Sequence, residues 1–180
     1  ARSILSFRKA RSENSPASAN RSPGKAMACV AGITSEILVK AIQKEFNVRT
    51  ISAENGGDIY ADSDKDLNIM IYAGSSVLSN QLALHIKKEQ LPLSICTSSG
   101  TVGHSFSYGV ADACVVCVKE AALADAFATA LANRIQHEND IQATIEFGLN
   151  HEEIESIIII KNDKIGYSEN TELIRVKKED

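Results

Sequence analysis

An alanine-rich segment constrains the fold of this chain more than any other part of it. Between Ala121 and Asn133, alanine occupies seven of the thirteen positions. A helix with such small side chains can lie very close to a sheet or to another helix. We expect this helix to extend over about 120–137. Asp125, Thr129 and Asn133 are spaced by four residues, so they share one narrow polar stripe of the helix.

Hydrophobic patterns elsewhere predict one earlier helix and many strands. The apolar residues of 26–46 recur with helical spacing, and Asn47 provides a stop. Short apolar runs between turn residues predict antiparallel strands. These strands are expected at 48–53, 59–61, 67–73, 82–86, 91–96, 113–118, 156–161, 165–167 and 173–176, with 82–86 and 91–96 forming a pair. The order of elements, which includes a short helix before Gly148, is typical of an α+β fold rather than a parallel doubly wound sheet.

Length and charge limit the classes of protein to consider. The chain has 180 residues and a net charge of -4, and we expect a single domain over 26–180. Residues 1–25 carry six basic side chains, one acid and no hydrophobic period, which predicts a basic, weakly ordered segment. The remainder is strongly acidic, so we exclude nucleic acid as the main partner. No apolar run approaches the roughly 20 residues of a membrane helix. We expect no membrane partner and a cytoplasmic location.

The four cysteines do not indicate a disulfide framework. They are too few and lie in hydrophobic surroundings, which is typical of a reducing compartment. Cys114 and Cys117 have the CxxC spacing, but they fall inside an apolar run that we predict to be a strand. Strand alternation would point the two sulfur atoms to opposite faces. We therefore interpret the pair as core residues and not as a redox centre.

The segment from Cys96 to Gly109 is expected to line a site. It holds three glycines, six Ser or Thr residues, one tyrosine and His104, whereas a simple connection needs only a few turn residues. His104 close to Ser98 and Ser99 leaves three alternatives open: a base for a serine nucleophile, a donor to a phosphate, or a residue that orders the loop. Neither a Gly-x-Ser-x-Gly elbow nor a Walker-type sequence is present.

Two further groups of polar residues carry candidate chemistry. Asp125 and Thr129 offer short oxygen ligands one helical turn apart, which suits a hard cation such as Mg²⁺ or a hydrogen-bond network with a neighbouring loop. The second group is a tight turn in which two glycines permit positive φ angles and close approach of a ligand. An ordinary hairpin turn is the alternative. The turn consists of Asn55, Gly56, Gly57 and Asp58.

Three segments together resemble the ApbE-like superfamily. They are 54–59, 97–100 with His104, and 124–130, and the resemblance covers about 26–167. The superfamily includes Mg²⁺-dependent transferases that move FMN from FAD onto a protein threonine. The segment from Ile95 to Ser105 more closely resembles an uncharacterised cytoplasmic branch. The resemblance implies a T-fold-like structure, an antiparallel sheet backed by helices, with a small-molecule ligand such as a flavin nucleotide.

The resemblance also implies a role for individual residues. Asp125 and Thr129 would bind Mg²⁺, and His104 would be the catalytic residue lining the same cavity. The flavin-binding residues would come from the glycine turn and the hydroxyl-rich segment: Asn55, Gly56, Gly57, Asp58, Thr97, Ser98, Ser99 and Gly100.

The chain departs from the transferases after the Thr-Ser-Gly segment. They continue with His-x-x-Asp-Pro-x-Thr-Gly, whereas His104 is followed by Ser105-Phe106-Ser107-Tyr108-Gly109 without an Asp-Pro pair. Flavin transfer and nucleotide binding without transfer therefore both stay open. Two other classes remain as alternatives: a non-catalytic binding or assembly module in which the loop and the helix stripe are structural, and a serine hydrolase. A homodimer is a further expectation from the acidic sheet with open edges.

Overall fold

The structure, a computed structural model, describes residues 4–7, 29–102 and 108–176. Its strands are β1 (Ile4–Phe7), β2 (Thr50–Asn55), β3 (Asp58–Ser63), β4 (Leu67–Met70), β5 (Leu82–Ile86), β6 (Leu93–Ser98), β7 (Ala113–Val118), β8 (Ser156–Lys161), β9 (Lys164–Ser168) and β10 (Glu172–Arg175). In this part of the chain, seven strands form a sheet in the order β1-β9-β8-β7-β6-β3-β2, and three form a sheet in the order β10-β5-β4. Paired strands are antiparallel except for β1 and β9.

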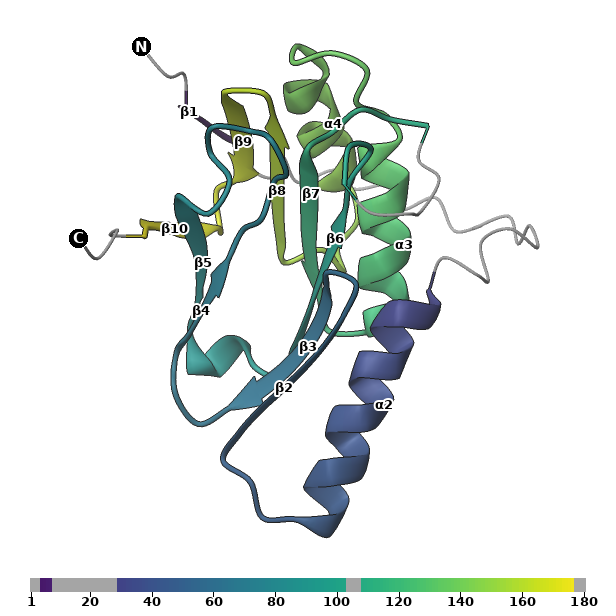
Figure 1. The fold of residues 1–180 in the computed structure, drawn as a ribbon, viewed down its shortest axis with the longest axis vertical. Coiled ribbons are helices and arrows are strands. Elements are labelled where there is room, and N and C mark those ends of the chain that lie inside the picture. The colour runs from purple at the N-terminus through teal and green to yellow at the C-terminus, as the bar shows by residue number, and fades with distance from the viewer. Residues whose placement is uncertain (1–3, 8–28, 103–107, 177–180) are drawn as a thin grey trace.

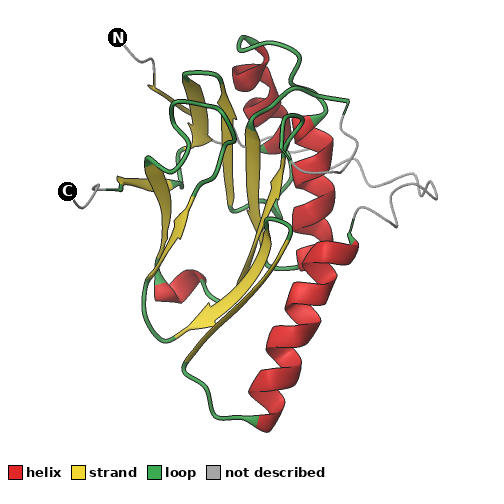
Figure 2. Ribbon diagram, in the orientation of Figure 1, coloured by secondary structure: helices red, strands yellow, loops and turns green. Residues whose placement is uncertain are grey.

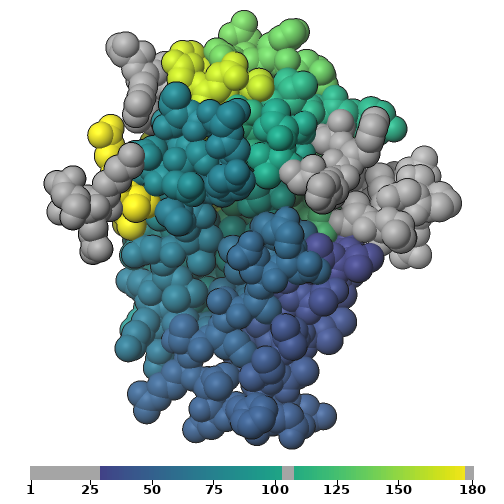
Figure 3. All heavy atoms as spheres, viewed as in Figure 1, coloured from purple at the N-terminus to yellow at the C-terminus, as the bar shows by residue number. Residues whose placement is uncertain are grey.

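Helices cover one face of the large sheet, and the small sheet covers the other. The α-helices of the described residues are α2 (Val30–Glu45), α3 (Ala121–Ala132) and α4 (Asp140–Gly148), and η1 (Lys88–Gln90) is a short 3-10 helix. Figures 1 and 2 show α2, α3 and α4 on one side of the large sheet and β4, β5 and β10 on the other. In the space-filling view, α2 and the β2–β3 hairpin make up the lower end of the molecule (Figure 3).

Strand β7 lies within the large sheet and contributes to two separate cores. Cys114 and Val116 pack with residues of α3 and α4, whereas Val115 and Cys117 pack with residues of the small sheet. All four side chains are buried. The prediction that the two sulfur atoms of the CxxC sequence point to opposite faces is confirmed, and the pair lacks the arrangement of a redox centre.

The alanines of α3 allow it to lie directly on β6 and β7. Ala121, Ala124, Ala128 and Ala132 are almost completely inaccessible to solvent and face the sheet. The α+β arrangement with an antiparallel sheet backed by helices is confirmed. The expected helix over 120–137 is correct in position but too long, because α3 ends at Ala132 and the chain turns toward α4.

The predicted pairing of 82–86 with 91–96 is wrong. Strand β5 pairs with β4 and β10 in the small sheet, and β6 pairs with β3 and β7 in the large one. The helix η1 carries the chain from one layer to the other, and the first four residues of β6 are buried, as expected for a strand between two layers. The strand expected over 67–73 is also shorter, because β4 ends at Met70.

Two sequence predictions concern the ends and the membrane. Strand β1 falls in the segment expected to be weakly ordered and pairs in parallel with β9; the rest of that segment lies outside the described residues. Among the helices that the structure describes, none combines the length and the apolar character needed to cross a bilayer.

Candidate functional site

Two buried carboxyl groups come together where the β2–β3 turn meets α3. Asp58 is the first residue of β3 and is 6% exposed, and Asp125 lies in the second turn of α3 and is 7% exposed. The carboxyl groups adjoin closely enough to form a hydrogen bond when one of them carries a proton. Oδ1 of Asp58 accepts a hydrogen bond from the backbone N–H of Thr97 at 3.2 Å. Oδ2 of Asp125 is buried and accepts no hydrogen bond from the described residues.

The glycine turn positions Asp58. Gly56 and Gly57 have φ angles of 64° and 100°, and residues with a Cβ atom rarely adopt such positive φ angles. This turn joins β2 to β3 with Asn55 opposite Asp58, and the predicted hairpin is confirmed. Because β3 pairs with β6 through Ile59, the turn places Asp58 beside the end of β6.

A close contact between two helices positions Asp125. An added Cβ on Gly32, in the first turn of α2, would lie only 3.0 Å from the carbonyl oxygen of Ala121 and 3.3 Å from Sγ of Cys96. Oε2 of Glu36 accepts a hydrogen bond at 3.1 Å from the N–H of Ala121, the first residue of α3. The absence of a side chain at residue 32 therefore allows the amino-terminal end of α2 to reach Asp125.

Burial and proximity change the acidity of both carboxyl groups. Burial, the charge of Asp125 and the hydrogen bond with it raise the pKa of Asp58 from 3.8 to about 7, against the smaller opposing effects of Cys96 and of the Thr97 N–H. Burial also raises the pKa of Asp125, while Asp58 and the backbone N–H of Gly32 oppose the increase. The positive end of the α2 dipole further favours negative charge at this position.

The two thiols next to the carboxyl pair are poor nucleophiles. Burial raises the pKa of Cys96 far above its ordinary value, and the charge of Asp58 adds to the effect. Burial, followed by the charges of Asp125 and Asp58, raises the pKa of Cys29. Since the thiolate is the reactive form of cysteine, these residues are not suited to nucleophilic catalysis.

The polar stripe of α3 leads from the carboxyl pair toward the loop before β7. Thr129 follows Asp125 by one turn and is half-buried. Asn133 follows the last residue of α3, and its Oδ1 accepts a hydrogen bond from the N–H of Tyr108 at 2.8 Å. At the end of this stripe, Asn133 thus helps to hold the loop before β7.

Hydrogen bonds within the hydroxyl-rich segment give it a largely structural role. Thr97 and Ser98 are the last residues of β6. The hydroxyl of Ser99 donates to the carbonyl oxygen of Ala111 at 3.3 Å and accepts the N–H groups of Thr101 and Val102, each at 3.0 Å. The hydroxyl of Ser99 thus helps to hold the loop between β6 and β7.

Of the predicted site residues, the structure brings Asp58, Thr97 and Asp125 together. Asn55 and Gly56 are exposed, as is Gly100, whose backbone lies against Gly109. An added Cβ on Gly57 would lie 3.6 Å from the carbonyl oxygen of Thr97. His104 lies outside the described residues, so its predicted role stays a prediction.

Sequence reasoning missed the residues that fix the relative positions of the helices and loops. Gly32 and Glu36 of α2 contact the start of α3. Of these two, only Gly32 could have been noticed in the sequence, because a glycine inside a helical pattern often marks a close contact. Asp112, which is 3% exposed, was also missed. Its Oδ1 accepts hydrogen bonds from Thr101 Oγ1 at 3.0 Å and from Lys161 Nζ at 3.5 Å, and its Oδ2 accepts the Asn162 N–H at 2.6 Å.

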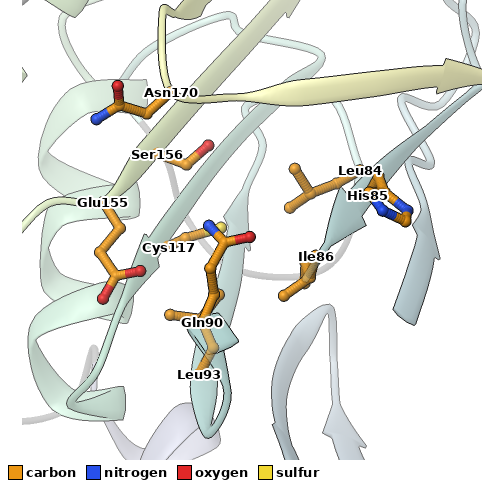
Figure 4. Close-up of a pocket in the computed structure, with 9 residues that line it drawn as sticks. All are labelled: Leu84, His85, Ile86, Gln90, Leu93, Cys117, Glu155, Ser156 and Asn170. Carbon is orange, nitrogen blue, oxygen red and sulfur yellow. The ribbon is translucent and has the colours of Figure 1, made fainter. Parts of the chain in front are cut away.

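A solvent-open hollow lies on the other side of the large sheet and contains none of the predicted site residues. It lies between β5, β6, β7 and the start of β8 and has a cavity volume of only about 10 Å³, roughly the room for one water molecule (Figure 4). It is lined by Leu84, His85, Ile86, Gln90, Leu93, Cys117, Glu155, Ser156 and Asn170. In the described part of the chain, no three residues of the types His, Cys, Asp or Glu are grouped to bind a metal. A cation at the carboxyl pair would therefore need hydroxyl, backbone or water oxygens as well.

Several curated proteins with the name UPF0280 are similar to this chain. The UPF0280 protein MJ1526 of Methanocaldococcus jannaschii is 41% identical over 145 residues, which cover 78% of this chain and 58% of the relative. The UPF0280 protein of Methanobrevibacter smithii is 39% identical over 78% of this chain and 60% of its own length. The one from Methanococcus vannielii is 45% identical over 67% and 48%. This chain thus matches about half of the length of these relatives.

A solved structure and a family model give two further matches. The crystal structure of the Pseudomonas stutzeri flavinyl transferase ApbE in its apo form matches with a TM-score of 0.49 and 16% identity, over 78% of this chain and 47% of that one. The model of the family described as AbpE bacteria matches residues 16–159. That match covers most of the chain, including both carboxyl groups, so the chain belongs to this family within the ApbE-like superfamily.

Proposed function

We propose that this protein binds a phosphorylated small molecule, a flavin nucleotide in the first instance, together with Mg²⁺ held by Asp125 and Thr129. The observation that carries the proposal is Oδ2 of Asp125, which is buried and accepts no hydrogen bond from the described residues. A buried polar atom without a partner is costly, and native structures rarely contain one without a reason. Carboxylate and hydroxyl oxygens are ligands that Mg²⁺ prefers.

The residues around this oxygen fit a ligand better than a purely structural role. A structural module would have hydrogen bonds from the loop after β6 to Asp125. The N–H of Thr97, near the end of β6, donates to Asp58 instead, and the backbone donor to Asp125 comes from Gly32 of α2. The amino-terminal end of α2 adds a positive potential that suits phosphate groups. In the β2–β3 turn, an added Cβ on Gly56 would meet no other atom within 4 Å, so the backbone at this residue is open to a ligand.

The proposed reaction is the transfer of a nucleotide group. Bound Mg²⁺ would offset the negative charge of a pyrophosphate. The chain itself would orient the ligand with the amides near Thr97 and Gly32 and keep the carboxyl pair away from bulk water. The protein named ApbE in the structural match is a flavinyl transferase. We extend the same reaction class to this chain as a proposal. We further propose a cytoplasmic location and a homodimer. Ile37 and Leu38 on α2 are exposed and offer apolar surface for the contact between the two subunits.

Calorimetric titration of the purified protein with FAD, with and without Mg²⁺, tests the proposal. We expect FAD to bind more tightly when Mg²⁺ is present, and Asp125→Asn to remove this difference. Glu146→Gln is the matched control. It likewise replaces one helical carboxylate by an amide, but at an exposed position. Absence of FAD binding, or an unchanged Mg²⁺ effect in Asp125→Asn, would contradict the proposed function.

A further inference from the structure

The carboxyl group of Asp58 is the most unusual group near the proposed Mg²⁺ site. It comes from the β2–β3 turn, whereas Asp125 comes from α3, so two elements far apart in the sequence bring the acids together. Within the described residues, neither carboxyl forms an ion pair with Lys, Arg or His. The donors that reach them include the uncharged N–H groups of Thr97 and Gly32.

Two adjoining buried carboxyl groups without a cationic partner are unfavourable for a folded chain. Buried charges in proteins are normally paired or bind a metal, because the loss of hydration is otherwise not compensated. Here both residues are more than nine-tenths buried, and Oδ2 of Asp125 accepts no hydrogen bond from the described residues. A divalent cation in contact with both groups would supply the missing partner and cancel both charges.

We infer that Asp58 is a second carboxylate ligand of the proposed cation and that the protein binds this cation before the nucleotide. The inference rests on the proposed function. With Asp125 alone, a bound Mg²⁺ would keep a positive charge and would need the phosphate to be neutralised. With Asp58 as well, the protein already balances the charge of the cation. Mg²⁺ commonly keeps several waters in protein sites, and these positions then receive phosphate oxygens.

The variant Asp58→Asn separates a ligand from a structural residue. The asparagine keeps an oxygen that can accept the N–H of Thr97, and its amide group can donate to Asp125. The metal-free variant should therefore unfold at a higher temperature than the wild type, because one buried acid is removed and the other gains a donor. Cation binding should weaken in the same variant. A residue that only supported the fold would lower the unfolding temperature instead.

The experiment measures binding of Mg²⁺ to the full chain in the absence of nucleotide. Calorimetry should show one site in the wild type, and Asp58→Asn should raise its dissociation constant at least about tenfold. Mg²⁺ should raise the unfolding temperature of the wild type and have little effect on the variant. Asp64→Asn is the matched control, because it makes the same change in charge at an exposed residue just after β3.

The outcomes distinguish this inference from the proposed function. If Mg²⁺ binds the wild type only in the presence of FAD, or binds Asp58→Asn as tightly as the wild type, the inference is wrong while the proposed function stands. If neither FAD nor Mg²⁺ binds, both are wrong. One Mg²⁺ site without nucleotide that weakens in Asp58→Asn and not in Asp64→Asn supports the inference.

Discussion

Asp112 and Asp125 are both buried aspartates beside the large sheet, but their surroundings differ. Asp112 is 3% exposed, and its two oxygens are satisfied by Thr101, Lys161 and the backbone of Asn162. Asp125 is 7% exposed and has one oxygen without a donor among the described residues. Burial of an acid alone therefore does not identify a binding site. Incomplete hydrogen bonding distinguishes Asp125, the proposed ligand, from Asp112, whose oxygens all have donors.

The largest effect is expected at Asp112. Asp112→Ala should lower the free energy of unfolding by about 3 to 5 kcal/mol, because the half-buried Lys161 loses its ion-pair partner and the N–H of Asn162 loses its acceptor. Urea denaturation measures the change, with exposed Asp64→Ala as a control that should have little effect. If Asp112→Ala lowered the free energy of unfolding no more than Asp64→Ala does, Asp112 would have no structural role. The distinction between Asp112 and Asp125 would then be wrong.

A smaller effect is expected at the contact that brings α2 to Asp125. In Gly32→Ala the new Cβ would lie 3.0 Å from the carbonyl oxygen of Ala121, so we expect a loss of about 1 kcal/mol after the gain in helix propensity. The displaced first turn of α2 should also weaken Mg²⁺ binding. Thr34→Ala, at an exposed position of the same helix, controls for helix propensity. Unchanged stability and Mg²⁺ affinity in Gly32→Ala would show that the close contact does not shape the site.

The smallest effect concerns Asp140, a partly exposed acid that serves as a baseline for the two buried ones. The N–H groups of Gln136 and His137 donate to its Oδ2 and lower its pKa. Because the folded state has the lower pKa, Asp140 stabilises the protein at neutral pH, and this contribution is lost as the pH falls through the acidic range. Asp140→Asn should slightly flatten the dependence of stability on acidic pH, measured by urea denaturation. A steeper dependence in the variant would contradict this assignment.

The sequence was sufficient for the class of fold and for half of the candidate site. Periodic apolar residues located α2 and α3, the two glycines located the β2–β3 turn, and the spacing of Asp125 and Thr129 identified the stripe. These features are local. The pairing of 82–86 with 91–96 was wrong because adjacent strands in the sequence can belong to different layers, and nothing within either segment records its partner.

The rest of the site depends on contacts between distant segments. The proximity of Asp58 to Asp125 requires the β3–β6 register and the packing of α3 on the same sheet. The bond between Glu36 and the first residue of α3 spans 85 positions in the sequence. Asp112 likewise contacts residues about 50 positions away. No short segment of the sequence contains both partners of any of these contacts. The roles of these residues could therefore be recognised only in the folded structure.

The burial of the thiols gives this protein a natural labelling site. Cys96, Cys114 and Cys117 are at most 1% exposed, whereas Cys29 is partly accessible just before α2. A thiol-reactive fluorophore applied to the native chain should therefore attach at Cys29 first, and slowly, because the pKa of this thiol is raised by burial and by the two nearby aspartates. The unmodified sequence thus carries one attachment point for a probe beside the carboxyl pair, where ligand binding would change its emission.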